Sequence, residues 1–234
     1  MKTLLTSFFI LVSTICSAQL VYFTYGYTGN STNLDGLNQV IRNYNTSRQW
    51  LDQEMDEISY LDGLAINTGL AYGGAFFEFE YSGRGKKKSA FGTDLNGNFG
   101  TRELKVKNNT MAMSVGFGGG GGNGVVALAA RAEFGTTKIK TRAFYEGEDK
   151  PDMEILDEKH LFAKAGPMLK ILLGEDGICG SLSLYYVWGV IHTDMTPSDE
   201  ILNNTFYNYD SPPEFKSTNN TFGFTLSVGF FGEG

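Results

Sequence analysis

Six charged residues occupy the polar positions of segments in which apolar and polar residues alternate. A buried charge is costly unless a partner of opposite sign lies beside it, so three carboxylates and three cations predict a neutral network of ion pairs. Glu78 and Glu80 could also serve as a general acid and base, but neighbours on one strand face are not specific for catalysis. The six residues are Glu78, Glu80, Arg131, Glu133, Lys164 and Lys170.

Histidine offers a second route to catalysis. His160 and His192 fall near the ends of predicted strands, and Asp194 and Ser198 follow His192 closely. No spacing among them matches a known nucleophile motif, so we predict no catalytic residue. The chain has 2 cysteines and 2 histidines, which leaves little for a structural zinc site. We predict no metal and no other cofactor.

A basic segment is the third candidate for chemistry. We expect it at the tip of a long loop, where its cations either remain solvated or contact the phosphates of lipopolysaccharide. The chain as a whole is acidic, with a net charge of -7. Nucleic-acid binding needs clustered cations, so we expect no nucleic-acid partner. The basic segment comprises Arg84, Lys86, Lys87 and Lys88.

The segment 1–18 has the layout of a secretory signal peptide. One lysine precedes an apolar run, and small residues close the segment before a cleavage site after Ala18. The run is shorter than the ~20 apolar residues that a membrane helix requires. The alternative is a lipoprotein signal acylated at Cys16, although Ile15 is larger than the residue that usually precedes such a cysteine. We expect a mature domain over 19–234.

Beyond the signal segment, apolar residues alternate with small or polar ones, as in β-strands. In 222–230 the bulky residues take the even positions, and Gly, Thr and Ser take the odd ones. The bulky face fills the interior of a soluble barrel but faces lipid in a membrane barrel. A narrow barrel of about eight strands accommodates small residues inside, so we expect the bulky face to contact lipid. Candidates for interfacial aromatic girdles are Tyr25, Tyr27, Tyr81 and Trp188.

The alternating segments predict eight antiparallel strands. Short turns at one end and long loops at the other are typical of bacterial membrane barrels. Gly73 and Gly74 suit a tight turn because glycine tolerates positive φ, and one unbroken strand over 64–82 is the alternative. The predicted strands are 20–29, 63–72, 75–83, 103–118, 124–140, 159–173, 178–192 and 219–231. The predicted long loops are 30–62, 82–102, 143–158 and 192–218.

The segment 30–62 departs from the strand pattern. Apolar residues recur at helical spacing in 34–44 and again in 51–58. Asn33 is a candidate cap for the first helix. We predict one or two short amphipathic helices in this first external loop, lying across the mouth of the barrel or against the outer leaflet.

With these features the chain resembles the small eight-stranded outer-membrane barrels of the OmpX and OmpA type, and more narrowly the outer-membrane barrels of the Bacteroidota. The resemblance is one of residue pattern and covers most of the mature chain. The segments that come closest to a sequence motif are 35–45 and the closing strand. Assembly-signal strands usually end in an aromatic residue, whereas three residues follow Phe231 here. The resemblance implies an all-β, eight-stranded antiparallel up-and-down transmembrane β-barrel. It also implies insertion by the barrel-assembly machinery into the bacterial outer membrane.

Three functions remain open from the sequence. The first is a non-enzymatic integral outer-membrane barrel with a plugged polar lumen, which contacts membrane lipid and has a structural or surface-binding role through its external loops. The second is a secreted lipocalin-like barrel that binds an apolar ligand inside. The third is an outer-membrane hydrolase or acyltransferase that uses His160 or His192. We favour the first, because the small residues of the polar face fit a narrow lumen and no spacing matches a nucleophile motif.

Overall fold

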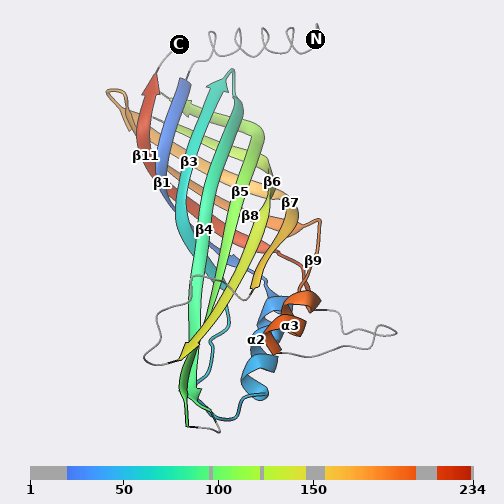
Figure 1. The fold of residues 1–234 in the computed structure, drawn as a ribbon. Helices are drawn as coiled ribbons and strands as arrows, with labels where there is room; N and C mark the ends of the chain where they lie inside the picture. Colours follow the sequence, from blue (N-terminus) through green and yellow to red (C-terminus); the bar gives the residue numbers. More distant parts are fainter. Residues whose placement is uncertain (1–19, 95–96, 122–123, 146–155, 204–214, 233–234) are drawn as a thin grey trace, which may run out of the picture.

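Eight strands close into a single antiparallel ring (Figure 1). The computed structural model describes residues 20–94, 97–121, 124–145, 156–203 and 215–232, so the predicted signal peptide lies outside the described residues. β1 pairs with β11 on one side and with β3 on the other, which closes the barrel. In order around the ring the strands are β1 (Leu20–Thr32), β3 (Tyr60–Tyr72), β4 (Ala75–Thr93), β5 (Phe99–Gly121), β6 (Gly124–Tyr145), β7 (Leu156–Glu175), β8 (Ile178–Gly189) and β11 (Thr221–Gly232).

Tight turns join strands at one end of the barrel, which we call the turn end. Gly73 and Gly74 have φ of 54° and 86°, and Asp176 and Gly177 have φ of 53° and 81°. Positive φ at both central residues matches the right-handed twist of a hairpin, which explains the choice of glycine and aspartate. The predicted turn at Gly73 is therefore confirmed, and the alternative of one unbroken strand over 64–82 is wrong. β1 begins and β11 ends at this end (Figure 1).

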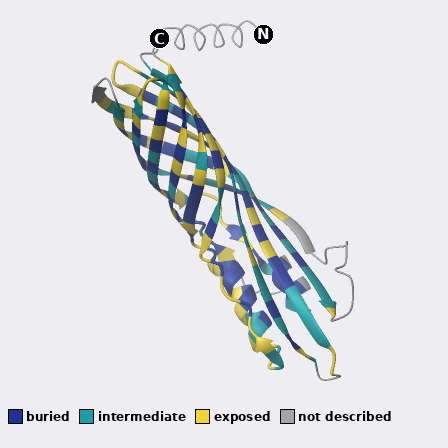
Figure 2. Cartoon of the chain, turned by 90° about the vertical axis from the view of Figure 1, so that its left-hand side faces the viewer, coloured by how far each residue is buried: buried dark blue, intermediate teal, exposed yellow. Residues whose placement is uncertain are grey.

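Bulky apolar side chains cover the outside of the barrel, and polar side chains fill its interior. Phe117, Leu128 and Leu161 are 81%, 70% and 71% exposed, whereas Thr225 and Ser183 are fully buried. Figure 2 shows this alternation of buried and exposed residues along the strands. The predicted orientation of the two faces is confirmed. A lipocalin-like barrel needs the bulky face inside, so the structure contradicts that alternative.

At the opposite end, which we call the loop end, four strands continue beyond the ring as a sheet. β3 leaves β4 near the pair Asp62 and Gly85; β4 and β5 stay paired as far as Thr93 and Phe99. The predicted loop 82–102 is therefore wrong over most of its length, because strand alternation continues through it. We name this sheet the extension. It comprises 86–93 of β4, 99–107 of β5, 138–145 of β6 and 156–159 of β7.

The two faces of the strands exchange polarity where the extension begins. Within the ring, β5 presents Met111 outward and buries Thr110 inside. In the extension the same strand buries Val106 on the inner face and exposes Lys105 and Lys107 outside. Side chains alternate strictly along a strand, so the exchange of polarity between the two faces indicates that the surroundings of the strand change. The outer surface is apolar along the ring and charged along the extension.

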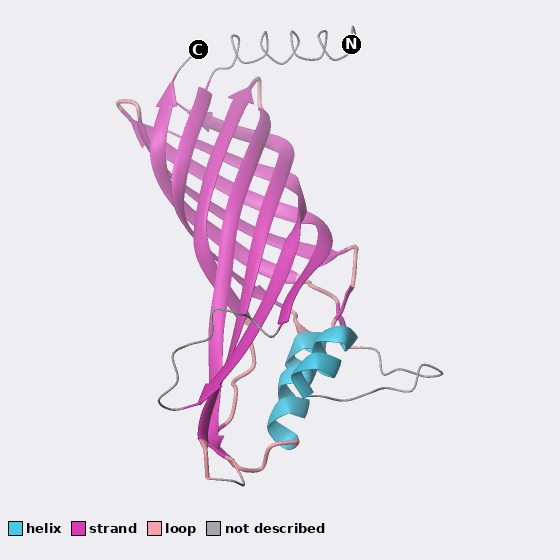
Figure 3. Ribbon diagram, in the orientation of Figure 1, coloured by secondary structure: helices cyan, strands magenta, loops and turns pink. Residues whose placement is uncertain are grey.

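Two helices cover the inner face of the extension (Figures 1 and 3). They are α2 (Asp35–Thr46) and α3 (Thr196–Asn203), and no helix in the described part of the chain is long and apolar enough to cross a membrane. The first predicted helix is confirmed. Apolar side chains of the helices, of the extension and of the segments beside them form a core distinct from the apolar cluster inside the barrel, and Leu61 at the loop end of β3 belongs to it. Its members are Leu34, Leu37, Val40, Ile41, Tyr44, Met55, Ile58, Leu61, Ala90, Leu104, Val106, Ile139, Met195, Leu202 and Phe215.

The second predicted helix, over 51–58, is wrong. Leu51 begins the short strand β2 (Leu51–Gln53), which pairs with β4. Met55 and Ile58 follow outside any regular element but are still buried in the core of the extension. The 192–218 segment contains α3, which the sequence did not predict, and the paired short strands β9 (Thr193–Asp194) and β10 (Lys216–Ser217).

Gly229 lies where the seam between β1 and β11 is tightest. A Cβ at Gly229 would lie 1.9 Å from the backbone oxygen of Phe23, whereas a Cβ at Gly180 would meet nothing within 4 Å. We expect Gly229→Ala to lower the free energy of unfolding by about 1–3 kcal/mol, because overpacking forces the backbone to shift. We expect Gly180→Ala to change it by less than about 0.5 kcal/mol. Urea titration of the folded protein in detergent measures both, and equal effects would contradict the tight seam.

Candidate functional site

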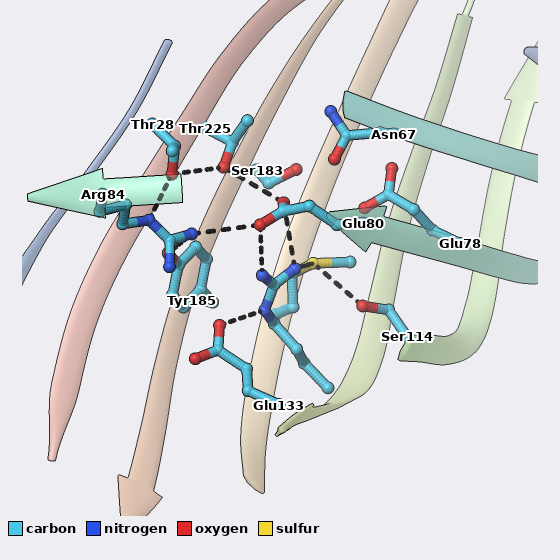
Figure 4. Close-up of polar contacts among 12 residues, drawn as sticks. Thr28, Asn67, Glu78, Glu80, Arg84, Ser114, Glu133, Ser183, Tyr185 and Thr225 are labelled. Carbon is cyan, nitrogen blue, oxygen red and sulfur yellow. Dashed lines mark hydrogen bonds and ion pairs between the residues drawn. The ribbon is translucent and has the colours of Figure 1, made fainter. Parts of the chain in front are cut away.

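Arg131 forms ion pairs with Glu80 and Glu133, two buried carboxylates inside the barrel that Figure 4 labels. Its Nη2 is 2.8 Å from Oε1 of Glu80, and its Nε is 2.9 Å from Oε1 of Glu133. The three side chains are fully buried, and the guanidinium also lies 4.3 Å from the centre of the Tyr185 ring. Hydrogen bonds between ionised groups are stronger than neutral ones, so these contacts hold β4 and β6 together across the bore.

Arg84 belongs to the same network, which corrects the expected place of this residue on a loop tip. Its Nη2 donates to Oε1 of Glu80 at 3.1 Å and to the hydroxyl of Tyr185 at 2.8 Å. Its Nε donates to Oγ1 of Thr28 at 3.0 Å. The signal that sequence reasoning missed is parity, since Glu78, Glu80 and Arg84 all occupy even positions of β4 and therefore share its inner face.

A second cluster surrounds Glu78 nearer the turn end. Oε2 of Glu78 accepts a hydrogen bond from the hydroxyl of Tyr22 at 2.6 Å and lies 2.6 Å from Nζ of Lys170. Lys170 also donates to Oγ of Ser183 at 3.1 Å. Glu78 and Glu80 therefore bind different cations, and each carboxylate is held by a buried ion pair.

Lys164 stands apart from the other five residues of the predicted network. Its Nζ donates to Oγ1 of Thr221 at 2.7 Å and lies 4.7 Å from the centre of the Phe162 ring. Glu133 is its cross-strand neighbour in β6. The structure thus places all six predicted residues inside the barrel, and with Arg84 the described lumen holds four cations and three carboxylates.

The two histidines and their sequence neighbours lie on different parts of the fold. His160 is on β7 opposite Thr137, and His192 is exposed after the end of β8. Oδ1 of Asp194 accepts hydrogen bonds from the backbone N and Oγ1 of Thr196, where α3 begins. Ser198 is fully buried. The described residues also contain no group of three or more His, Cys, Asp or Glu placed to hold a metal.

The three consecutive lysines of the basic segment lie on a strand of the extension, not on a loop tip. Nζ of Lys86 is 3.2 Å from Oδ1 of Asp62, and Nζ of Lys88 is 2.7 Å from Oδ2 of Asp56. Lys87 forms an ion pair with Glu103. The alternation of strand side chains sends Lys87 to the outer face and the other two toward the inner face.

A pocket of ≈310 Å³ opens between α2 and the far end of the extension. Two guanidiniums from distant parts of the chain flank one aromatic ring, with Arg48 4.1 Å and Arg102 5.8 Å from the centre of the Tyr44 ring. Arg48 donates to the neutral acceptors Ser47 and Asn203, and Nη1 of Arg102 has no hydrogen-bond partner within the described part of the chain. Burial lowers the pKa of Arg48, and the charge of Arg102 lowers it further.

The pocket therefore combines positive charge with aromatic walls. Trp50, Phe144 and Tyr145 add to the aromatic lining, and none of the lining residues that the structure describes is a carboxylate. Such a site suits an anionic group carried on a ring, because guanidinium binds carboxylate and phosphate while aromatic faces stack on flat or sugar rings. Sequence reasoning missed this site because Arg48 and Arg102 are far apart in the chain and no local spacing links them.

The chain matches no protein-family profile and no curated protein. Among solved structures, it is similar to Ail, the attachment invasion locus protein of Yersinia pestis. The structure of Ail with the heparin analogue sucrose octasulfate matches with a TM-score of 0.40 and 8% identity, over 91% of this chain and 98% of Ail. Ail without it matches with a TM-score of 0.39 and 7% identity, over 92% and 99%. The outer membrane protease OmpT from Escherichia coli matches with a TM-score of 0.33 and 6% identity, over 92% and 96%.

Proposed function

We propose that this chain is a non-enzymatic integral outer-membrane barrel with a closed lumen, which anchors a binding module on the cell surface. The observation that carries the proposal is the belt of exposed apolar side chains around a lumen of buried ion pairs. Contiguous apolar surface of this extent is incompatible with a monomer in water. Lipid tails would cover this apolar surface, and the closed ring leaves no unpaired strand edge in the lipid.

The membrane proposal predicts how the protein behaves on extraction. We expect it to sediment with membranes, to require detergent for solubilisation, and to change its mobility on a denaturing gel after boiling, because a closed barrel resists detergent until heated. Recovery as a soluble monomer without detergent would contradict the proposal. Segment 1–18 as a cleaved signal peptide, insertion by the barrel-assembly machinery and membership of the OmpX-like or Bacteroidota barrels are parts of the same proposal. They rest on the sequence pattern.

The closed lumen predicts the absence of a conducting pore. Arg131, Glu80 and Tyr185 meet across the bore, and eight strands leave little space that side chains do not fill. We expect the purified protein in a planar lipid bilayer to produce no stable conductance steps under conditions where a 16-stranded porin does. Steps of uniform size in the wild-type protein would contradict a plugged lumen.

The non-enzymatic part of the proposal rests on the contacts of the candidate residues. The buried carboxylates are engaged with cations, and Asp194 binds the first turn of α3. Incubation of the protein in detergent with denatured casein or with phospholipid is expected to yield no cleavage product. Turnover that disappears in a His160→Gln/His192→Gln double variant would establish the enzymatic alternative.

The pocket beside Tyr44 is the place in the module that favours a binding role. We propose that it takes a small ring-bearing anion, with Arg48 and Arg102 on the charge. Trp50 lines the pocket, and the other tryptophan, Trp188, lies on the ring. In a Trp188→Phe background, glucuronate and glucose 6-phosphate are therefore expected to change Trp50 fluorescence, whereas glucose is not. Arg102→Gln should remove that response. An identical response to glucose, or one that survives Arg102→Gln, would contradict the site.

A further inference from the structure

The strands of the ring are inclined to the barrel axis (Figure 1). Following paired residues from Leu20 through β3, β4 and the other strands in ring order leads back to β1 at Asn30, ten residues nearer the loop end. Such a shift fixes the tilt of the strands, which is about 40° in small barrels. Neighbouring strands lie about 4.8 Å apart, so each step in this direction raises the paired residue by about 3 Å toward the loop end.

The apolar outer face is short on β4 and β5, which we call the low side. On β4 it runs from Ala75 to Tyr81, a span of six residues, and glycines follow. On β5 it runs over an equal span from Phe117 to Met111, and the polar Asn109 follows toward the loop end. At this tilt one residue advances about 2.5 Å along the axis, so the apolar face is about 15 Å high here.

The apolar outer face is twice as high on β7 and β8, which we call the high side. On β7 the outward residues are apolar from Leu173 to Leu161, a span of twelve residues. On β8 and the residue after it, they are apolar, aromatic or glycine over an equal span from Ile178 to Val190. Leu161 and Val190 are 71% and 69% exposed. The height is about 30 Å, whereas the apolar band of a membrane barrel is typically about 25 Å tall.

Two residues at one height show the difference between the sides. The line of paired residues from Met113 on β5 passes through β6 and β7 to Trp188 on β8, so Trp188 lies about 9 Å nearer the loop end than Met113. Asn109 lies four residues beyond Met113 on β5, which is about 10 Å along the axis. Trp188 is 53% exposed, and the next outward residue on its side is apolar. Asn109 is polar, and the next outward residue on its side is Lys107.

The two sides therefore fit different thicknesses of hydrocarbon. Tilting the barrel moves the upper and lower borders of one side together, so it does not remove the difference in height. On β3, beside the low side, the outward Asp62 forms an ion pair with Lys86, and a charge on the lipid face of a barrel is destabilising. A bilayer accommodates an apolar face shorter than its hydrocarbon by thinning beside it.

We propose that the leaflet at the loop end is thinner beside β4 and β5 than beside β7 and β8. Lipid tails cover the high side as far as Leu161 and Val190, and the polar layer of the leaflet descends to Asp62 and Asn109 at the low side. The occupant of the high side is the acyl layer of the surrounding bilayer, because this face is continuous with the rest of the belt. The inference rests on the proposed membrane location and adds that the barrel deforms the leaflet on one side.

The test measures the depth of single tryptophans in phosphatidylcholine vesicles whose lipids carry bromine at defined positions of the acyl chain. Trp50→Phe leaves Trp188 as the reporter on the high side. Trp50→Phe/Trp188→Phe/Asn109→Trp places the reporter at the same height on the low side. Quenching by bromine should place Trp188 deeper in the hydrocarbon by at least about 5 Å, which is the axial length of two residues.

The matched control moves both reporters six residues toward the turn end. Leu182→Trp on β8 and Val115→Trp on β5, each in the Trp50→Phe/Trp188→Phe background, lie at one height within the belt, so their depths should be equal. Every variant is first checked for the change in gel mobility on boiling. If Asn109→Trp fails this check, Gly83→Trp replaces it, because Gly83 pairs with Asn109 and a Cβ there would meet only Oδ1 of Asn109 at 3.7 Å.

Three outcomes would overturn the proposal, and they differ in what else they refute. Equal depths for Trp188 and the reporter at position 109 would show a leaflet of uniform thickness and leave the membrane location intact. Loss of quenching at Trp188 while Leu182→Trp remains quenched would show that a second copy or another protein covers the high side. Absence of quenching at all four positions would refute the membrane location itself.

Discussion

Replacing Arg131 by methionine is expected to lower the free energy of unfolding by about 3–5 kcal/mol. Glu133 would lose the guanidinium that lies 2.9 Å away, and Glu80 would lose one of its two arginine contacts. Removing one partner of a buried ion pair leaves a charge without compensation in a medium that solvates it poorly. Methionine retains most of the side-chain length, so the loss reports mainly on charge.

Urea unfolding of the protein in detergent, followed by tryptophan fluorescence, measures the effect. The matched control is Arg42→Met, because Arg42 and Glu57 form an ion pair 2.7 Å long whose side chains are 54% and 50% exposed. Exposed pairs contribute about 0–1 kcal/mol. Adding Glu133→Gln to Arg131→Met should recover part of the lost stability. A loss no larger than that of Arg42→Met would show that the lumen network does not hold the barrel together.

Leu37→Asp is expected to detach α2 from the extension while the ring stays folded. Leu37 is fully buried in the core of the extension, which is distinct from the apolar cluster inside the ring. Leu→Ala at such a site costs about 2–5 kcal/mol, and a buried unpaired carboxylate costs more. Proteolysis within 48–58 should accelerate by at least about thirtyfold, since cleavage follows the population of the locally opened state.

The control for this prediction is Gln39→Asp, which places the same charge on the exposed side of α2. It should leave the cleavage rate within about twofold of wild type, and both variants should retain the change in gel mobility on boiling. Loss of that change in Leu37→Asp would show that the module and the ring fold as one unit. Unchanged proteolysis would contradict the core between helix and sheet.

The two-residue period of apolar and polar residues was enough to predict most of the fold from the sequence. Bulky apolar residues alternate with small or polar ones along each strand of the ring, so the pattern that identifies a strand also assigns its two faces. The difference in side-chain size predicts which face lies outside the barrel. The Gly73-Gly74 turn was readable because positive φ restricts residue choice. The inner position of Glu78, Glu80 and Arg131 follows from the same parity.

Where the surroundings change, the same reading failed. Beyond Ser82 the strand carries charged residues, which suggested a loop, yet the same parity continues through Arg84 into the extension, where the two faces exchange polarity. A strand whose outer face contacts water has charged residues outside and apolar residues inside. A strand whose outer face contacts lipid has the opposite arrangement, and both alternate with a period of two. Following the unchanged alternation through this exchange of polarity would have found the extension.

Only the tertiary structure decided which residues meet. The sequence determined that this chain forms an eight-stranded ring with charges inside, because alternation is a local property of each strand. Whether Arg131 binds Glu80 or Glu78 depends on strand register and the shape of the bore. Likewise, α3 is short and is held by its contact with α2, where Nδ2 of Asn43 donates to Oδ1 of Asp199 at 3.1 Å. Such contacts join residues far apart in the chain, so no local pattern encodes them.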